Sequence, residues 1–141
     1  MTLNPPEQSQ NAQLKIVEPV LQFCVYCDSI GQDRVNKPIL IGLFDEFKFR
    51  TFPSLVSQFF ITLRWINGTG SHKSAVRILD PNRLPVFTST STAFVLKHRA
   101  DPFTCNYSIQ NFRFSRPGVY WVEVLLNGSP YSSYPISVLE S

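Results

Sequence analysis

Few residues of this chain have side chains suited to catalysis or metal binding, and the first candidates are three cysteines. Cys24 and Cys27 form a C-x-x-C pair, and Cys105 could join them with His72 and His98, because thiolate and imidazole are the ligands that zinc prefers. A single C-x-x-C without a second half is weak evidence for zinc. Residues three apart in a strand point to opposite faces, which disfavours a shared metal or a mutual disulfide. We therefore expect reduced, structural thiols and no metal or other cofactor.

The two histidines are the remaining candidates for acid–base chemistry. Ser71, His72 and Asp80 could be imagined as a hydrolytic triad, but nearness in sequence is no evidence of triad geometry. His98 lies in a basic run, residues 97–99, at a predicted strand end. We expect both histidines to be exposed loop residues and name no catalytic residue. A hydrolase or metal enzyme around His72 or His98 stays an alternative.

Two further motifs have ordinary explanations. Residues 68–73 superficially resemble a phosphate loop, but the glycine spacing is wrong and a strand is predicted to follow, so we interpret them as a hairpin turn. Asp45 and Glu46 are adjacent carboxylates that could contribute to a cation site. Calcium loops carry several spaced acidic ligands, so we interpret this pair as the polar side of a bulge or turn.

The elements that must position these residues are strands. The chain has 141 residues, 13% of them aromatic and only 16% charged, with eleven prolines, a composition that favours strands and turns over helices. Apolar residues alternate in about eight short segments separated by turn signals such as Asn-Gly and Pro-Gly. We predict an all-β fold, an antiparallel two-sheet β-sandwich, in a single domain of residues 14–141. Residues 1–13 are predicted to be a flexible N-terminal tail.

Two local predictions concern the start and the middle of this domain. In the first strand, the inward face is predicted to hold Leu21, Phe23 and Val25, with Cys24 on the other face. After the Phe-Pro break at residues 52–53, residues 54–57 are predicted to form a single helical turn. The strand at residues 59–66 is clearer, with four large apolar side chains on one face.

The clearest strands are apolar on one face and partly apolar on the opposite face as well, whereas a sandwich sheet normally has one solvent-exposed polar face. Either the chain itself or a partner must cover this surface. We favour a partner, and a symmetric homodimer is the commonest solution. The candidate interface residues are Phe60, Arg64, Ile66, Val119, Trp121, Glu123 and Leu125.

The order of several motifs resembles that of a known family. These motifs are residues 41–45 (IGLFD), Phe52-Pro53, Leu79-Asp80-Pro81, Phe112-Arg113-Phe114 and Pro117-Gly118-Val119-Tyr120. The chain resembles, over residues 14–139, a family of small uncharacterised bacterial proteins with a domain of unknown function. The resemblance implies an immunoglobulin-like sandwich. It implies no activity and no functional residue.

Charge and hydropathy narrow the class of partner. The net charge of +3 is small and the basic residues are scattered along the chain, so we expect no nucleic-acid partner. No apolar run approaches the ~20 residues that span a bilayer, so we expect no membrane partner. The N-terminus lacks a signal-peptide pattern, which predicts a cytoplasmic location. The function that fits best is a non-enzymatic, self-associating interaction module. The alternative is carbohydrate or other small-ligand binding through surface aromatics such as Tyr26, Trp121, Tyr131 and Tyr134.

Overall fold

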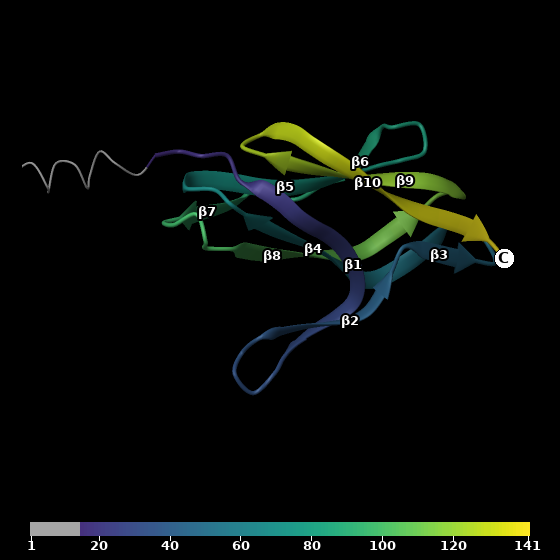
Figure 1. Ribbon diagram of the computed structural model, residues 1–141. Helices are drawn as coiled ribbons and strands as arrows, with labels where there is room; N and C mark the ends of the chain where they lie inside the picture. Colours follow the sequence, from purple (N-terminus) through teal and green to yellow (C-terminus); the bar gives the residue numbers. More distant parts are fainter. Residues whose placement is uncertain (1–14) are drawn as a thin grey trace, which may run out of the picture.

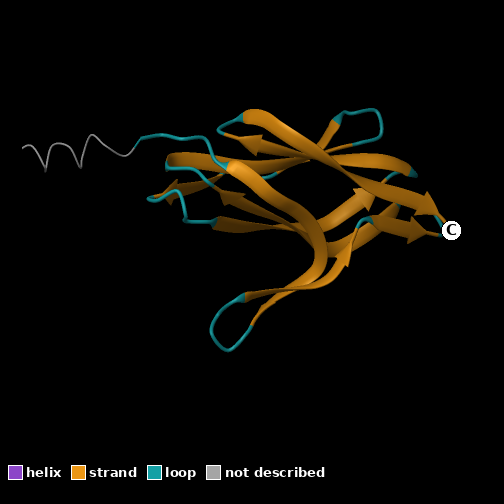
Figure 2. Ribbon diagram, in the orientation of Figure 1, coloured by secondary structure: helices purple, strands orange, loops and turns teal. Residues whose placement is uncertain are grey.

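The computed structural model describes residues 15–141, and the predicted tail of residues 1–13 lies outside the described residues. Ten strands joined by short loops and turns make up this part of the chain, without any helix (Figure 2). They are β1 (Val20–Gln32), β2 (Pro38–Phe44), β3 (Glu46–Phe49), β4 (Ser54–Ile66), β5 (Gly70–Leu79), β6 (Pro85–Thr88), β7 (Thr92–Leu96), β8 (Phe103–Phe114), β9 (Gly118–Leu126) and β10 (Ser129–Glu140). The all-β prediction is confirmed, with ten strands in place of about eight. Within residues 15–141, no helix has the length and hydropathy that crossing a membrane requires.

The strands form two sheets that lie one above the other (Figure 1). The four-stranded sheet has the order β2-β1-β4-β8, and the six-stranded sheet has the order β3-β10-β9-β5-β6, with β7 pairing along the first half of β5. All pairs are antiparallel except β3 with β10. The predicted two-sheet sandwich is therefore confirmed. The immunoglobulin-like strand order stays a prediction.

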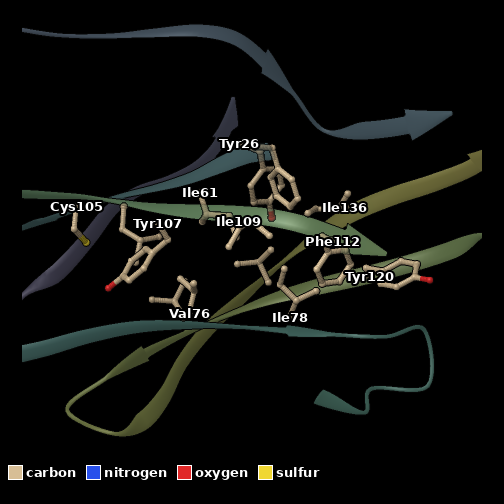
Figure 3. Packing of buried hydrophobic residues seen from close by; sticks show 14 of the residues in the cluster. Tyr26, Ile61, Val76, Ile78, Cys105, Tyr107, Ile109, Phe112, Tyr120 and Ile136 are labelled. Carbon is tan, nitrogen blue, oxygen red and sulfur yellow. The ribbon is translucent and has the colours of Figure 1, made fainter. Parts of the chain in front are cut away.

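The core lies between the two sheets and is built by alternation along the strands (Figure 3). From β4 it receives Phe59, Ile61, Leu63 and Trp65, each at most 1% exposed, as predicted for this strand. From β9 it receives the alternate residues Tyr120, Val122, Val124 and Leu126. Each fully buried side chain of this size contributes roughly 1.5–3 kcal/mol of transfer free energy. Alternation in β4 and β9 thus decides which side chains face outward.

The first strand departs from the predicted phase. The pairing of β1 with β4 shifts register between Leu21 and Phe23, and beyond this bulge Cys24 and Tyr26 pack against the core. A bulge adds one residue to a strand and so inverts the alternation after it. The inward prediction was right for Leu21 and wrong for Phe23 and Val25, which lie on the outer face.

The predicted helical turn at residues 54–57 is also wrong. These residues are the beginning of β4, and Ser54 and Val56 pair with Phe114 and Phe112 of β8. The long neighbouring strand offers a full ladder of backbone partners, which outweighs a weak local helical preference. β4 is therefore thirteen residues long.

The chain changes sheet at Asp45. β2 ends at Phe44 in one sheet, and β3 begins at Glu46 in the other, where the Asp45 carbonyl accepts a hydrogen bond from the Ser137 amide at 3.1 Å. Asp45 and Glu46, interpreted from the sequence as the polar side of a bulge or turn, thus lie at a bend between the two sheets. Such corners are a known way for a strand to leave one layer of a sandwich.

The β1–β2 hairpin curves away from the body of the sandwich and ends in a projecting turn (Figure 1). The Asp33 carboxylate closes this turn by accepting hydrogen bonds from the amides of Val35 at 2.9 Å and Lys37 at 2.8 Å. Gly42 in β2 has φ +72°, and a Cβ there would collide with the Asp28 carboxylate. Glycine takes this φ without strain, and any other residue would be strained and would have to displace the Asp28 side chain.

Candidate functional sites

The three thiols are free and lie on two sides of the four-stranded sheet. Cys24 and Cys105 face the core, and both pair in register with Leu63, which separates them. Cys27 is fully buried on the outer face, where its register partners are Leu43 and Phe60. The predicted opposite orientation of Cys24 and Cys27 is confirmed. Among residues 15–141, no three His, Cys, Asp or Glu side chains come together as metal ligands.

Burial keeps these thiols protonated. Burial raises the pKa of Cys24 to about 12, with a smaller contribution from nearby Cys105, and burial is also the largest cause that raises the pKa of Cys27 and Cys105. The thiolate is the nucleophilic and metal-binding form of cysteine. The three side chains therefore behave as small buried hydrophobes rather than as reactive groups.

His72 lies inside a strand, so the prediction of an exposed loop residue is wrong for it. β5 begins at Gly70, and the His72 side chain is almost fully buried against Phe94, with 3% of the residue exposed. Asn127 presents its side-chain nitrogen to Nδ1 of His72 at 3.1 Å, because its oxygen accepts from the Lys73 amide at 2.8 Å. His72 Nε2 then donates to the Thr69 carbonyl at 2.8 Å. Both ring nitrogens are occupied, and neither is free for a substrate.

His98 is exposed, as predicted, in the turn after β7. Its amide donates to the Asp101 carboxylate at 3.2 Å, and its carbonyl accepts from the Asp101 amide at 3.0 Å. These bonds involve the His98 backbone only. The residues around His98 thus form a turn, and within residues 15–141 no group of three potential metal ligands includes His98.

The imagined triad of Ser71, His72 and Asp80 is not assembled. Ser71 and His72 are adjacent in β5 and point to opposite faces. Asp80 follows the far end of β5, about 26 Å along the strand from His72 at ~3.3 Å per residue. Its carboxylate accepts hydrogen bonds from the amides of Asn82 at 2.8 Å and Leu84 at 2.9 Å. Asp80 therefore serves the β5–β6 turn.

The predicted interface residues divide between two surfaces. Those of β9 lie on the outer face of the six-stranded sheet, opposite the core residues of the same strand. There Glu123 accepts a hydrogen bond from Arg77 Nε at 2.8 Å, and the Arg83 guanidinium lies 4.3 Å from the ring centre of Trp121. Leu125 is 8% exposed, and Val119 is 40% exposed. Arg77 and Arg83 therefore contact Glu123 and Trp121 on this face, whereas Val119, and also Val86, Val95 and Leu139, remain exposed on it.

The other predicted interface residues lie on the outer face of the four-stranded sheet. Phe60 and Ile66 are half-buried there, and the Arg64 guanidinium donates to Thr104 Oγ1 at 2.8 Å. The outer faces of the two sheets point away from each other, so the seven residues do not form one contact surface.

A third apolar feature was not among the predicted sites. Ile39, Ile41 and Leu43 alternate along β2 on the outer face and are 42%, 51% and 63% exposed; we call them the β2 row. Leu43 is separated from Phe60 only by the buried Cys27. The signal was present in the sequence as alternating apolar residues in a segment without charge. It could not be assigned to an outer face before the sheets were known.

The aromatic side chains proposed for sugar binding are also dispersed. Tyr26 is buried in the core, and Trp121 lies on the outer face of the other sheet. Tyr131 contacts Trp65 edge to face at 5.0 Å between ring centres, and its hydroxyl accepts from the Leu21 amide at 3.2 Å. These four side chains therefore do not form one platform.

A pocket of about 430 Å³ opens where β1 and β2 of one sheet meet β10 of the other; we call it the β1–β10 pocket. Most of its surface is apolar. Its lining residues are Cys24, Val25, Tyr26, Leu43, Phe44, Asp45, Tyr134 and Pro135. The sequence could not indicate this pocket, because it depends on how the two sheets are placed at this corner.

The family model that matches this chain covers residues 22–139, which includes all ten strands apart from the ends of β1 and β10. The chain belongs to the family of unknown function DUF6941. The resemblance to a family without an assigned activity is therefore confirmed. A search of curated proteins found no match.

Among solved structures, this DUF6941 chain is similar to part of a β-glucosidase from Listeria innocua. For the glucosidase alone, the TM-score is 0.45 at 12% identity. For its complex with isofagomine, the TM-score is 0.47 at 13% identity, and for the D270A mutant in complex with laminaribiose it is 0.48 at 10% identity. The match covers 85–86% of this chain but only 16% of the glucosidase chain. At this level of similarity it carries no argument about the DUF6941 chain.

Proposed function

We propose that this DUF6941 protein is a non-enzymatic interaction module that forms a homodimer through β2. The observation that supports the proposal is that β2 pairs only with β1 among residues 15–141 and so forms a sheet edge bearing an exposed apolar row. Both ring nitrogens of His72 are engaged in hydrogen bonds, and burial raises the pKa of all three thiols. A protein surface, rather than nucleic acid or a membrane, is the partner class that fits an uncharged strand on a chain of small net charge.

β2 differs from the other sheet edges in lacking protection. Soluble proteins usually blunt an edge strand with charges or by keeping it short, because its free backbone groups can pair with another chain. β3, β6 and β7 are four or five residues long, and β3 carries the Lys48–Glu46 ion pair at 3.7 Å. β8 presents polar residues on its outer face. β2 has seven residues and no charge.

A two-fold axis is the simplest way to satisfy this edge. Antiparallel pairing of β2 with β2 of a second copy would continue the four-stranded sheet across the dimer. A two-fold contact is self-complementary, so the same uncharged strand serves on both sides. The two β2 rows would then lie side by side, and Leu43 would extend the apolar surface toward Phe60.

The test is the solution mass of matched variants by size-exclusion chromatography with light scattering across a concentration series. Ile41→Glu places a charge in the β2 row, and we expect it to convert a wild-type dimer into a monomer with an unchanged thermal melt. Val119→Glu is the control, because Val119 has similar exposure on the outer face of the six-stranded sheet. We expect it to remain a dimer.

Two results would count against the proposal. If the wild-type protein stays monomeric throughout the concentration series, the β2 edge does not mediate self-association. A dimer that survives Ile41→Glu but dissociates in Val119→Glu would place the interface on the six-stranded sheet instead.

A further inference from the structure

A second pocket lies on the six-stranded sheet, beside the first half of β5; we call it the β5–β7 pocket. Its volume of about 480 Å³ is within the range of small-molecule sites. β5 supplies three of its lining residues, β7 supplies three more, and the turn between β9 and β10 supplies the last. They are Ser71, His72, Lys73, Ala93, Phe94, Val95 and Asn127. Three segments that are far apart in the sequence therefore meet at this pocket.

The β5–β7 pocket opens on the outer face of the sheet. His72 points inward and is buried, so its neighbours Ser71 and Lys73 point outward, and both are exposed. Ser71 and Lys73 pair in register with Val95 and Ala93 of β7, which share the outer face with them. Ala93 and Val95 are exposed as well. A ligand can thus reach these four side chains from solvent.

The polar side chains of this pocket are hydrogen-bond donors. Lys73 contributes its ammonium group, and within residues 15–141 no Asp or Glu forms a salt bridge with it. Ser71 contributes an exposed hydroxyl. The Asn127 side-chain nitrogen carries two hydrogens and uses one of them for His72 Nδ1, so the second remains available. The pocket therefore offers donors from three side chains.

The charge of the β5–β7 pocket favours an anion. Lys73 is the one charged residue that lines it, and no carboxylate does. A carboxylate beside Lys73 would gain an ion pair, whereas a cation would meet repulsion. Ala93, Phe94 and Val95 make up the apolar part of the lining. A small carboxylate that carries an apolar ring or chain matches both features.

Two other pockets of the described chain lack this combination. The β1–β10 pocket is lined by Asp45 and by no Lys or Arg, so it disfavours an anion. A pocket of about 400 Å³ near β6 is lined by uncharged residues, among them Thr88, Asn106 and Tyr107. Of these three pockets, the β5–β7 pocket is the one with a cation.

We infer that the β5–β7 pocket binds a small carboxylate with an apolar ring or chain. Lys73 and Ser71 hold the carboxylate, and the apolar part lies against Val95 and Ala93. No residue of the β2 row lines this pocket, and β2 belongs to the other sheet. Carboxylate binding therefore does not depend on the dimer proposed above.

The probe is 4-fluorobenzoate, an apolar ring with one carboxylate, followed by ligand-observed ¹⁹F NMR at pH 7. Two comparison compounds isolate its charge: 4-fluorobenzamide has a neutral head group of similar shape, and 4-fluorobenzylamine carries a positive charge. We expect the benzoate to bind about five- to tenfold more tightly than the benzamide. This factor lies between the contributions of an exposed ion pair and of a hydrogen bond to a charged group. The amine should not bind.

A first pair of variants tests the role of Lys73. Lys73→Gln removes the charge, and we expect it to weaken benzoate binding by about five- to tenfold while leaving benzamide binding unchanged. Lys97→Gln is the matched control, because Lys97 is exposed just after β7 but does not line the pocket. We expect this control to bind benzoate as the wild type does.

A second pair of variants tests the apolar wall. Val95→Asp places a negative charge in the pocket and should abolish benzoate binding at millimolar concentration. Val86→Asp is its control, because Val86 is 50% exposed, against 54% for Val95, and lies in β6 outside the pocket. Benzoate should change the amide shifts in ¹⁵N spectra of the wild type mainly at residues 71–73, 93–95 and 127. Spectra of the variants show whether each is folded.

Several outcomes would overturn the inference. These are the absence of benzoate binding to the wild type at millimolar concentration, equal binding by Lys73→Gln and the wild type, and amide shifts that map outside the pocket. Equal losses in Lys73→Gln and Lys97→Gln would also overturn it, because benzoate would then respond to the overall charge of the protein.

Discussion

The indole N–H of Trp65 donates a hydrogen bond to the hydroxyl of Ser74 at 2.9 Å, and both residues are completely buried. Trp65 belongs to the four-stranded sheet and Ser74 to the six-stranded sheet, so this bond joins the two layers through the core. The Cys105 thiol approaches the same hydroxyl at 3.8 Å. One serine thus satisfies polar groups from two strands of the opposite sheet.

Ser74→Ala should destabilise the fold by about 1–3 kcal/mol, because it leaves the buried indole N–H without an acceptor. Urea unfolding followed by tryptophan fluorescence measures the change. Ser71→Ala is the control, since Ser71 is exposed in the same strand, and it should shift the unfolding free energy by less than about 0.5 kcal/mol. Equal stability of the two variants would mean that the indole has another acceptor.

Asn127→Gly should cost about 1–3 kcal/mol, although glycine accepts the φ of +53° found at this position. The loss comes from the side-chain bonds to Lys73 and His72, which glycine cannot make. Asn36→Gly is the matched control, with φ +65° at the tip of the β1–β2 hairpin. Chemical denaturation of both variants measures the change in unfolding free energy. Equal destabilisation of the two variants would instead indicate that the loss comes from the backbone entropy of glycine.

Alkaline pH should destabilise the protein. Burial raises the pKa of Cys24 and of Tyr107 to about 12, and it also raises the pKa of Tyr26, so the folded state keeps protons that the unfolded chain releases. The stability is therefore complete below about pH 8.5, the ordinary pKa of a cysteine, and falls as pH rises above it. The urea midpoint should be lower at pH 10.5 than at pH 7.5. Cys24→Ala should reduce this difference, and a midpoint that rises with pH would contradict the assignment.

The sequence predicted those parts of the fold that depend on local alternation. In β4, every second residue from Phe59 to Trp65 is large and apolar, and a period of two in a strand puts all four on one face. In β1 the same reasoning failed after Leu21, because a bulge is set by pairing with β4 and leaves no mark in the hydrophobic pattern.

The candidate sites followed from the sequence less well. Sequence showed that Phe60 and Trp121 lie opposite core residues, but two outward faces look alike until the sheets are assigned. Trp121 lies beneath Arg83 on one sheet, whereas Phe60 lies on the other, near the exposed Leu43. The hydrogen-bond partner of His72 Nδ1 is Asn127, which is 55 residues away in the chain.

By itself, the sequence determined the all-β class, the Asn-Gly and Pro-Gly turns and the inward faces of the regular strands, because these follow from neighbouring residues and the two-residue period of a strand. Tertiary structure alone decided the sheet switch at Asp45, the free edge at β2 and the pocket between β1 and β10. Each of these depends on contacts between residues far apart in the chain. Long-range pairing selects among arrangements that local patterns leave equally favourable.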